Sequence, residues 1–297
     1  MPHPRLLEMP QAQRERVFHI EFRLYFLGTV HRSDLIERFG IKEAAASRDL
    51  AEYRKIRPDN MVFDTKSKAY FKGDCFDPLF EYTPKQVLSA LSQGMGAHFA
   101  GMHTSMIACE TPVLLNHPSV EVLSALSTAI HQGQAVHIEY CSLSSGTSER
   151  EIVPLALVDN GLRWHVRAYD RKRNRFADFV LTRITNAVVR FGHVERHEKK
   201  DADIQWNRIV EMEIVPHPNE KNVEHPNAVE LDYGMKDGVL KVNIRAAVAG
   251  YVLRRWNVDC SPDHSRKGKE YQLWLRNTPA LYGVENLSIA PGYGSEA

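Results

Sequence analysis

The sequence contains few cysteines and no long apolar run. Its four cysteines, Cys75, Cys109, Cys141 and Cys260, lie far apart, without a Cys-x-x-Cys pair and without histidines at zinc-finger spacing. This spacing argues against a disulfide framework and a zinc site, and we expect buried cysteines that act as small apolar residues. No stretch approaches the roughly 20 apolar residues that span a bilayer, and the first residues lack the apolar core of a signal peptide, so we expect a cytoplasmic protein.

The sequence also lacks the common catalytic motifs. It has no G-x-S-x-G, no P-loop, no H-E-x-x-H and no G-x-G-x-x-G between a strand and a helix. We therefore expect neither an enzyme nor a bound cofactor. His98 and His103 have a single carboxylate nearby, Glu110, and such a sparse set of ligands does not predict a metal site.

Charge is distributed unevenly along the chain. With 297 residues the chain is long enough for two or three domains, and its 43% hydrophobic and 25% charged residues are typical of globular proteins. The net charge of +1 divides into +3 for residues 1–75, −3 for 76–135, +4 for 136–200 and −3 for 201–297. A basic module is the footprint expected of an anion or nucleic-acid binder, although a solvated charged surface gives the same count.

The first basic module predicts three short helices. Apolar residues at three- and four-residue spacing indicate a helix over residues 11–27, and Gly28 ends it. Ser33 is placed to cap a second helix, which Gly40 ends. A third helix over residues 42–53 turns small and basic side chains to one side, as a helix in the major groove requires.

A hairpin with a basic tip follows these helices. Residues 61–63 and 69–71 alternate in strand fashion around the tip at 64–68. Three helices and a basic hairpin in this order predict a winged helix-turn-helix, and a helical domain that only binds proteins is the alternative. The predicted DNA-contacting residues are Ser33, Lys42, Ser47, Arg48, Arg54, Lys55, Lys66 and Lys68.

The acidic segment after the hairpin is interpreted as a connector. Thr83 followed by Pro84 is a typical helix start, and periodic apolar residues predict a helix over residues 83–108. Glycines and alanines crowd residues 94–101, which permits close approach of another backbone but weakens an isolated helix.

The second basic module changes from a helical to a strand pattern. After a helix over residues 118–131, the apolar period falls from about 3.6 to 2. A strong hairpin turn at 159–161 leads into a strand that would place Trp164 in the core and turn His165 and Arg167 to the other side. We expect a small barrel or sheet with one packed face and one binding face. The predicted strands are 136–141, 152–158, 163–169 and 176–184.

Several segments of this module resemble a WYL domain. They are YCSLSSG at 140–146, PL at 154–155, GLRWHVRAYD at 161–170, RF at 175–176 and TRI at 182–184. The namesake tripeptide reads WHV here, at 164–166, and WHVRAY is similar to the form in repressors of phage-defence operons such as BREX and CBASS. The resemblance extends to ASRDL at 46–50, which looks like the usual recognition helix.

The resemblance implies an α+β fold of four parts. These are a winged helix-turn-helix (1–78), a helical connector (79–117), a WYL domain with an Sm-like barrel (118–200) and a small α/β dimerisation domain (201–297). It implies a homodimeric transcriptional repressor that binds inverted-repeat operator DNA and senses a nucleic-acid or nucleotide ligand. An RNA-binding regulator that uses the barrel is the alternative.

Cations, hydroxyl groups and one aromatic ring in the WYL segment suit a phosphate-bearing ligand. The predicted ligand-binding residues are Tyr140, Ser142, Ser144, Arg150, His165, Arg167, Arg175 and Arg183.

The C-terminal third predicts a small α/β domain. Strand-like runs cover residues 211–215, 239–247 and 271–275, with a helix over 250–257. Within that helix Arg254, Arg255 and Trp256 would either lie over the partner's WYL pocket or form a solvated face with one buried tryptophan. We expect residues 291–297 to fray.

Overall fold

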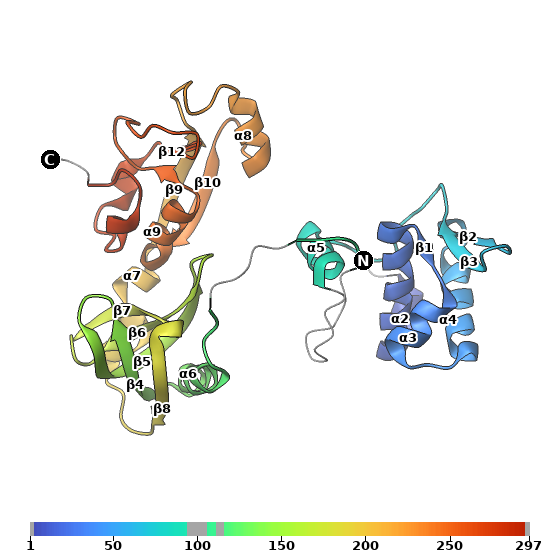
Figure 1. Cartoon of the computed structure of the whole chain (residues 1–297), viewed down its shortest axis with the longest axis horizontal. Coiled ribbons are helices and arrows are strands. Elements are labelled where there is room, and N and C mark those ends of the chain that lie inside the picture. The colour runs from blue at the N-terminus through green and yellow to red at the C-terminus, as the bar shows by residue number, and fades with distance from the viewer. Residues whose placement is uncertain (1–2, 94–105, 111–115, 295–297) are drawn as a thin grey trace. The chain divides into compact units, whose positions relative to one another are not determined.

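The computed structural model describes residues 3–93, 106–110 and 116–294. The chain forms two compact units, residues 1–111 and 112–297, coloured blue to teal and green to red in Figure 1. Helices and mainly antiparallel sheets occupy separate stretches, so the predicted α+β class is confirmed. Within the described part of the chain, no helix is both long and apolar enough to cross a bilayer.

The helices of the N-terminal unit form where the sequence predicts them. The helix expected over residues 11–27 is α2 with a π-helical turn, Arg23–Leu27, at its end, and Gly28 closes it with φ +79°. Gly40 closes α3 in the same left-handed conformation, with φ +62°, which glycine adopts without steric cost. The helices are α1 (Pro4–Glu8), α2 (Gln11–Phe22), α3 (Arg32–Phe39) and α4 (Glu43–Ile56).

The start of α3 differs from the prediction. The residue before its first turn is His31, whose backbone N–H donates a hydrogen bond to the Asp34 carboxylate at 2.6 Å. Ser33 lies inside the helix and is exposed. The predicted cap was therefore wrong, because a capping side chain has to come from the non-helical residue that precedes the helix.

The predicted hairpin is present and joins a third strand. Strands β2 (Met61–Asp64) and β3 (Ala69–Lys72) pair antiparallel, and β1 (Thr29–Val30) adds to the other side of β3. The sequence pattern missed β1 because two residues are too few to show a period. Helices and sheet enclose one core. Its buried apolar residues are Leu6, Met9, Val17, Ile20, Leu24, Val30, Leu35, Ala46, Leu50, Tyr53, Ile56, Met61 and Leu79.

A buried carboxylate fastens the segment after the hairpin to this core. Glu21 accepts hydrogen bonds from the backbone N–H groups of Leu79 and Phe80 at 2.8–2.9 Å. The hydroxyl groups of Tyr53 and Tyr82 donate to it at 3.0 and 3.1 Å. Burial raises the pKa of Glu21, although these four donors oppose that shift. These donors replace the water that the Glu21 carboxyl group loses on burial, and three of them hold the segment after the hairpin against the core.

The predicted connector helix is shorter where the structure describes it. Helix α5 covers Pro84–Gln93, and residues 106–108 are not helical, so the predicted end at 108 was wrong. Residues 94–105 lie outside the described residues, and with them the glycine- and alanine-rich stretch and the two histidines at 98 and 103.

The WYL segment forms a five-stranded antiparallel sheet with a helix against it. The strands follow the order β7-β6-β5-β4-β8, and α6 packs on β4, β5 and β8 (Figure 1). The strand predicted over 176–184 is wrong at its end, because a 3-10 turn at Leu181–Arg183 separates two strands. The elements are α6 (Val120–Gln132), β4 (Ala135–Ser142), β5 (Gly146–Asp159), β6 (Trp164–Asp170), β7 (Arg175–Val180) and β8 (Ile184–Arg190).

The C-terminal part forms a four-stranded mixed sheet in the order β10-β9-β12-β11 with helices packed on it. The strand predicted over 239–247 ends at Arg245, and the predicted helix begins four residues earlier than expected. The pattern did not predict α8 or β11. The elements are α7 (Ile204–Asn207), β9 (Ile209–Pro216), α8 (Pro226–Tyr233), β10 (Leu240–Arg245), α9 (Ala246–Arg255), β11 (Val258–Asp259) and β12 (Leu273–Leu275).

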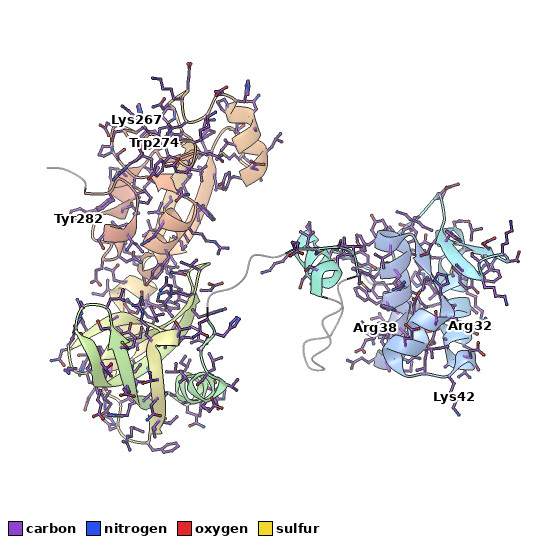
Figure 2. The ribbon with its side chains drawn as sticks, in the orientation of Figure 1. Arg32, Arg38, Lys42, Lys267, Trp274 and Tyr282 are labelled. Carbon is purple, nitrogen blue, oxygen red and sulfur yellow. The ribbon has the colours of Figure 1, made fainter. Side chains whose placement is uncertain are left out.

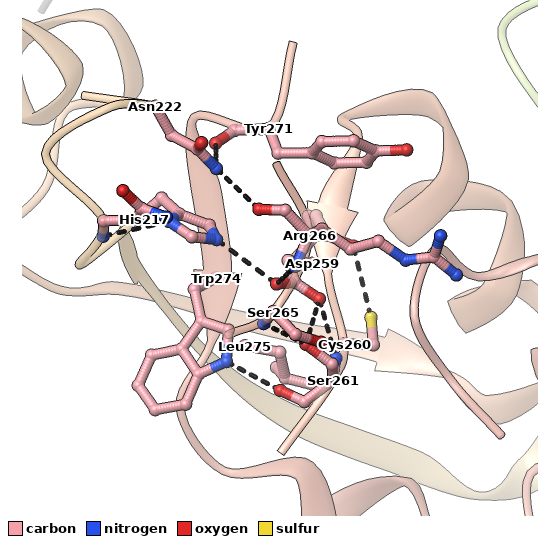
Figure 3. Close-up of polar contacts among 12 residues, drawn as sticks. His217, Asn222, Asp259, Cys260, Ser261, Ser265, Arg266, Tyr271, Trp274 and Leu275 are labelled. Carbon is pink, nitrogen blue, oxygen red and sulfur yellow. Dashed lines mark hydrogen bonds and ion pairs between the residues drawn. The ribbon is translucent and has the colours of Figure 1, made fainter. Parts of the chain in front are cut away.

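One buried carboxylate organises the loops of this domain (Figure 3). Asp259 accepts hydrogen bonds from the backbone N–H and the hydroxyl of Ser261 at 2.8 and 2.7 Å, and from the Arg266 N–H at 3.0 Å. Asp259 also contacts His217 Nε2 at 3.2 Å, and the Asn219 N–H donates to His217 Nδ1 at 3.1 Å. Because Nδ1 accepts, Nε2 carries the proton. Both ring nitrogens are engaged, so this His–Asp pair is structural.

The expectation of buried cysteines was wrong for three of the four. Cys260 is buried, whereas Cys75, Cys109 and Cys141 are exposed. Cys141 lies on the outward side of β4, where side chains alternate between two faces. The expectation that residues 291–297 fray was wrong at the start of this range, since the Cys260 N–H donates to the Pro291 carbonyl at 2.8 Å. Residues 295–297 lie outside the described residues.

Candidate functional site

Helix α4 presents a basic face on the side away from the core. Ala46, Leu50 and Tyr53 are buried, as predicted, while Arg48 and Arg54 are exposed. Within the described residues neither arginine has a carboxylate at ion-pair distance. The two guanidinium groups are therefore available to an anionic partner.

The other residues predicted on this helix are also accessible. Lys42 precedes the first turn of α4 and points away from the unit (Figure 2). Lys55 is exposed and pairs with Glu52 at 3.2 Å, and Ser47 is half-buried. An exposed ion pair of this kind is worth little, so Glu52 leaves Lys55 free to exchange partners.

Sequence reasoning missed the contacts that orient α4. Asp49 is buried and accepts hydrogen bonds from Arg16 Nε at 2.6 Å and from Gln13 Nε2 at 3.2 Å, both on α2. At the other end Arg32 of α3 pairs with Glu43 at 3.2 Å. The available signal was an aspartate at position 49 within the apolar stripe of a predicted helix, because a buried carboxylate needs donors.

The hairpin tip places its two lysines in solvent. Asp64 accepts hydrogen bonds from the hydroxyl and N–H of Ser67 at 2.5 and 2.8 Å and from the N–H of Lys66 at 3.4 Å, which lower the pKa of Asp64. Lys68 takes a left-handed conformation with φ +54°, and Lys66 and Lys68 are both exposed. The carboxylate shapes the turn, and the lysines extend from it.

The predicted WYL arginines do not converge on one open surface. Arg150 is buried and pairs with Asp170 at 2.7 Å. Arg175 begins β7 and Arg183 lies beyond its end, so a six-residue strand, about 20 Å long, runs between them. Arg175 is exposed and Arg183 half-buried. The predicted cluster of four arginines was therefore wrong as a single site.

Arg167 belongs to a buried ion network. Its guanidinium donates to both carboxylate oxygens of Asp203 at 2.8 and 3.0 Å and to Asp178 at 3.3 Å. Burial disfavours the charged guanidinium, but these hydrogen bonds and charges outweigh it and raise the pKa of Arg167. Tyr251 of α9 donates to the second oxygen of Asp178 at 2.8 Å. The network therefore links the WYL sheet to the C-terminal domain.

His165 completes this contact. Its ring stacks on Tyr251 with 5.0 Å between ring centroids, and burial lowers its pKa. The face with His165 and Arg167, expected to be open to a ligand, is thus covered by α9. Trp164 was expected in the core and is instead 47% exposed, because it lies beside the turn where β6 begins. The two expectations were wrong for different reasons: α9 covers the face that the alternation left open, and Trp164 lies at the end of its strand, where the core does not reach it.

The remaining predicted residues lie at one end of the sheet. The C-terminal end of β4 and the turn after β7, Leu181–Arg183, are both at this end. Tyr140 is buried, and its hydroxyl accepts the Val180 N–H at 3.4 Å. Ser142, the half-buried last residue of β4, contacts Ser144 at 3.2 Å in the exposed turn that follows. Tyr140 pairs with Ile184, which follows Arg183, so the serines and Arg183 lie at the same end of the sheet.

Arg255 of α9 lies against the WYL hairpin of its own chain. A Cβ atom at Gly161, which has φ +84°, would lie 2.3 Å from the Arg255 guanidinium. Arg254 and Arg255 are exposed and Trp256 is half-buried, so the expected solvated face with one buried tryptophan is met only in part. Contact with a partner's WYL pocket stays a prediction.

Comparisons with known proteins cover both units. Residues 12–93 match the BrxR transcriptional regulator winged helix-turn-helix domain, residues 121–189 the WYL domain, and residues 209–281 the BrxR transcriptional regulator C-terminal dimerization domain. The chain is 32% identical over 281 residues to the DNA-binding transcriptional repressor CapW of Escherichia coli, covering 92% of each chain.

Two further CapW repressors are similar over most of their length. The chain is 30% identical to that of Pseudomonas aeruginosa, over 90% of this chain and 89% of the relative. It is 30% identical to that of Stenotrophomonas maltophilia, over 84% of each. These are regulators of transcription and not enzymes, as the missing catalytic motifs predicted. The chain therefore belongs to the family of BrxR-type WYL-domain transcriptional regulators that includes the CapW repressors.

Proposed function

We propose that this chain is a homodimeric transcriptional repressor that binds an inverted-repeat operator and controls a phage-defence operon. Residues 1–78 contact the DNA, 79–117 connect, 118–200 sense a ligand and 201–297 hold two copies together. The observation that carries the proposal is the face of α4, where Arg48 is an exposed cation on a helix whose opposite side is core. A dimer doubles the number of bases that one recognition helix reads.

The contact residues divide by what they reach. Arg48, near the start of α4, is placed to read a base edge, because the N-terminal part of a recognition helix enters the major groove. Lys66 and Lys68 at the hairpin tip have the reach and charge to hold phosphates, which adds affinity without sequence preference. The full proposed set is Ser33, Lys42, Ser47, Arg48, Arg54, Lys55, Lys66 and Lys68.

The test uses the DNA immediately upstream of the gene. We expect the full chain to bind an inverted repeat there with half-sites one helical turn apart, about 34–36 Å, and to sediment as a dimer at micromolar concentration. Arg48→Ala should lower operator affinity. The matched control is Arg190→Ala, which truncates an exposed arginine of the WYL sheet and should leave operator affinity unchanged. A monomer that binds single half-sites as well as the full repeat would contradict the proposal.

The RNA-binding alternative predicts the opposite preference. A regulator that uses the WYL sheet on single strands should bind single-stranded RNA more tightly than duplex DNA. Competition between operator duplex and single-stranded RNA of the same sequence separates the two. Loss of RNA binding in Arg183→Ala, with no effect of Arg48→Ala on either ligand, would favour the RNA regulator.

We further infer that the WYL domain senses a nucleic-acid or nucleotide ligand at the end of its sheet. Ser142, Ser144 and Arg183 are the accessible members of the predicted set at that end, and they offer hydroxyl groups and a cation to a phosphate. Arg150 and Arg167 are buried in ion pairs with Asp170, Asp178 and Asp203, so they are not available to this ligand. Arg183→Ala should abolish the response of operator binding to oligonucleotides while leaving ligand-free operator affinity unchanged.

A further inference from the structure

The N-terminal unit contains a cavity on the side of α2 and α3 that faces α5. Its volume is about 1060 Å³, comparable with small-molecule sites, which range up to about 1000 Å³. The described residues that line it come from these three helices and from the segment before α5, and none of them belongs to α4 or the hairpin. The cavity, called the α2–α5 cavity below, is therefore separate from the proposed DNA-binding face.

Aromatic rings form much of the cavity wall. Phe18 lies at the centre of them, edge-on to Phe80 at 5.1 Å and stacked on Tyr82 at 5.6 Å between ring centroids. Phe22 and Phe39 complete the aromatic lining. The contacts between rings hold their orientations, so the wall offers flat, preformed apolar surfaces on which another flat ring can stack.

Charged groups line the same cavity without pairing. They are Arg14, Arg38 and Lys85 on one hand and Glu15 and Glu81 on the other. Among the described residues, none of the five takes part in an ion pair. Burial lowers the pKa of Arg38, and the charge of Glu15 opposes that shift without forming an ion pair. An anionic ligand next to Arg38 and Lys85 would therefore favour their charged forms, and a carboxylate in the cavity favours a donor.

The positions of these charges indicate where a ligand's charge belongs. Arg38, labelled in Figure 2, lies over the ring of Phe39 at 5.1 Å from the centroid, so its guanidinium stays next to the aromatic wall. His19 also lines the cavity, and burial, Arg38 and Arg23 together lower its pKa to about 3. A neutral imidazole leaves the arginines and Lys85 as the groups that can compensate a negative charge.

We propose that the α2–α5 cavity is a binding site for a nucleoside monophosphate, independent of the WYL domain. The base stacks on Phe18 and Tyr82, the phosphate lies at Arg38 and Lys85, and the exocyclic amino group of the base reaches Glu15 or Glu81. A simple aromatic acid would offer no donor to Glu81 and would leave Glu15 with only the Gln11 side-chain amide, at 3.0 Å. Inorganic phosphate would leave the rings uncovered. A base joined to a phosphate satisfies all three kinds of group.

The site lies directly before the recognition helix in the chain. Arg38 and Phe39 are the last two residues of α3, and Gly40 leads from them to α4. A ligand held by Arg38 therefore contacts the helix-turn-helix itself, from the side that leaves the DNA face open.

The experiment titrates the full chain with AMP, CMP, GMP and UMP by isothermal titration calorimetry. We expect saturable binding of at least one of them. The nucleoside that corresponds to it and inorganic phosphate should each bind at least about tenfold more weakly. Arg38→Ala and Lys85→Ala should each weaken that binding about tenfold. Both side chains are exposed, so neither substitution removes core contacts, and equal thermal unfolding of the variants would confirm this.

The control variant is Arg190→Ala, an exposed residue of the WYL sheet outside both proposed ligand sites, which should leave nucleotide affinity unchanged. The proposal is overturned if none of the four monophosphates binds, or if binding persists in Arg38→Ala and Lys85→Ala but is lost in Arg183→Ala. Operator binding measured without nucleotide reports the repressor function separately. Failure of the cavity proposal therefore leaves that measurement intact, and failure of operator binding leaves the calorimetry intact.

Discussion

Truncation of two of the predicted ligand-binding arginines should affect the free energy of unfolding very differently. Arg167→Ala removes a guanidinium that donates to Asp203 at 2.8 and 3.0 Å and to Asp178 at 3.3 Å. It leaves two carboxylates, 1% and 11% exposed, without their cation. Arg183→Ala removes a half-buried side chain that has no ion pair in the described part of the chain.

The expected magnitudes follow from this difference. Breaking a buried pair by removing one partner costs about 3–5 kcal/mol, because the remaining charge is desolvated without compensation. Asp203 keeps the Trp206 N–H and Asp178 keeps the Tyr251 hydroxyl, so we expect the lower half of that range, about 3–4 kcal/mol. Arg183→Ala should change the free energy of unfolding by less than about 0.5 kcal/mol.

Tryptophan fluorescence isolates the relevant unit in a urea titration. All four tryptophans lie in residues 112–297, so their emission reports that unit while the full chain is used. If Arg167→Ala lowers stability by less than about 1 kcal/mol, the ion network is not structural and our reasoning fails. Asp203→Ala should also cost less in the Arg167→Ala background than in the original chain, since the pair is already broken.

Three further predictions concern other parts of the chain. Arg48→Ala should reduce the discrimination between operator and random DNA by about 1–3 kcal/mol, whereas Lys66→Ala should weaken binding to both DNAs alike. Lys66→Ala should also reduce the slope of log affinity against log salt concentration by about 1. If Arg48→Ala weakened binding to both DNAs equally, Arg48 would contact a phosphate and not a base. Gly161→Ala should destabilise the second unit by at least about 1 kcal/mol in the same urea titration, because φ is +84° and a residue with a Cβ is strained there. The exposed Arg255 guanidinium, 2.3 Å from the new Cβ, can move aside, and Gly192→Ala, in open space, should not destabilise the unit. His19 has a pKa lowered to about 3 in the folded state, so the unfolded chain binds more protons between pH 6.5 and 3, and stability should fall as pH falls through this window. Circular dichroism melting of His19→Leu should show a shallower acid loss than the original chain, and an equally steep loss would exclude His19 as its source.

Local sequence patterns determined most of the elements and the proposed DNA surface. The three- and four-residue spacing of Val17, Ile20 and Leu24 and the glycines at 28 and 40 predicted helices that the structure confirms. Arg48 and Lys66 were identified from an amphipathic helix and a basic hairpin tip. These features depend on contacts within one turn of helix or across one hairpin, so neighbouring residues are enough to predict them.

Only the tertiary structure decided what the WYL arginines do. Strand alternation assigns His165 and Arg167 to one face of a sheet, but it cannot tell whether that face meets solvent or another domain. The carboxylate that holds Arg167 lies 36 residues away in sequence, and Tyr251 lies in a helix of the C-terminal domain. The sequence suggested that Arg167 is available to a ligand, but in the fold it is buried and paired with Asp203. Such pairings depend on which distant segments fold together, and periodicity along one strand carries no information about them.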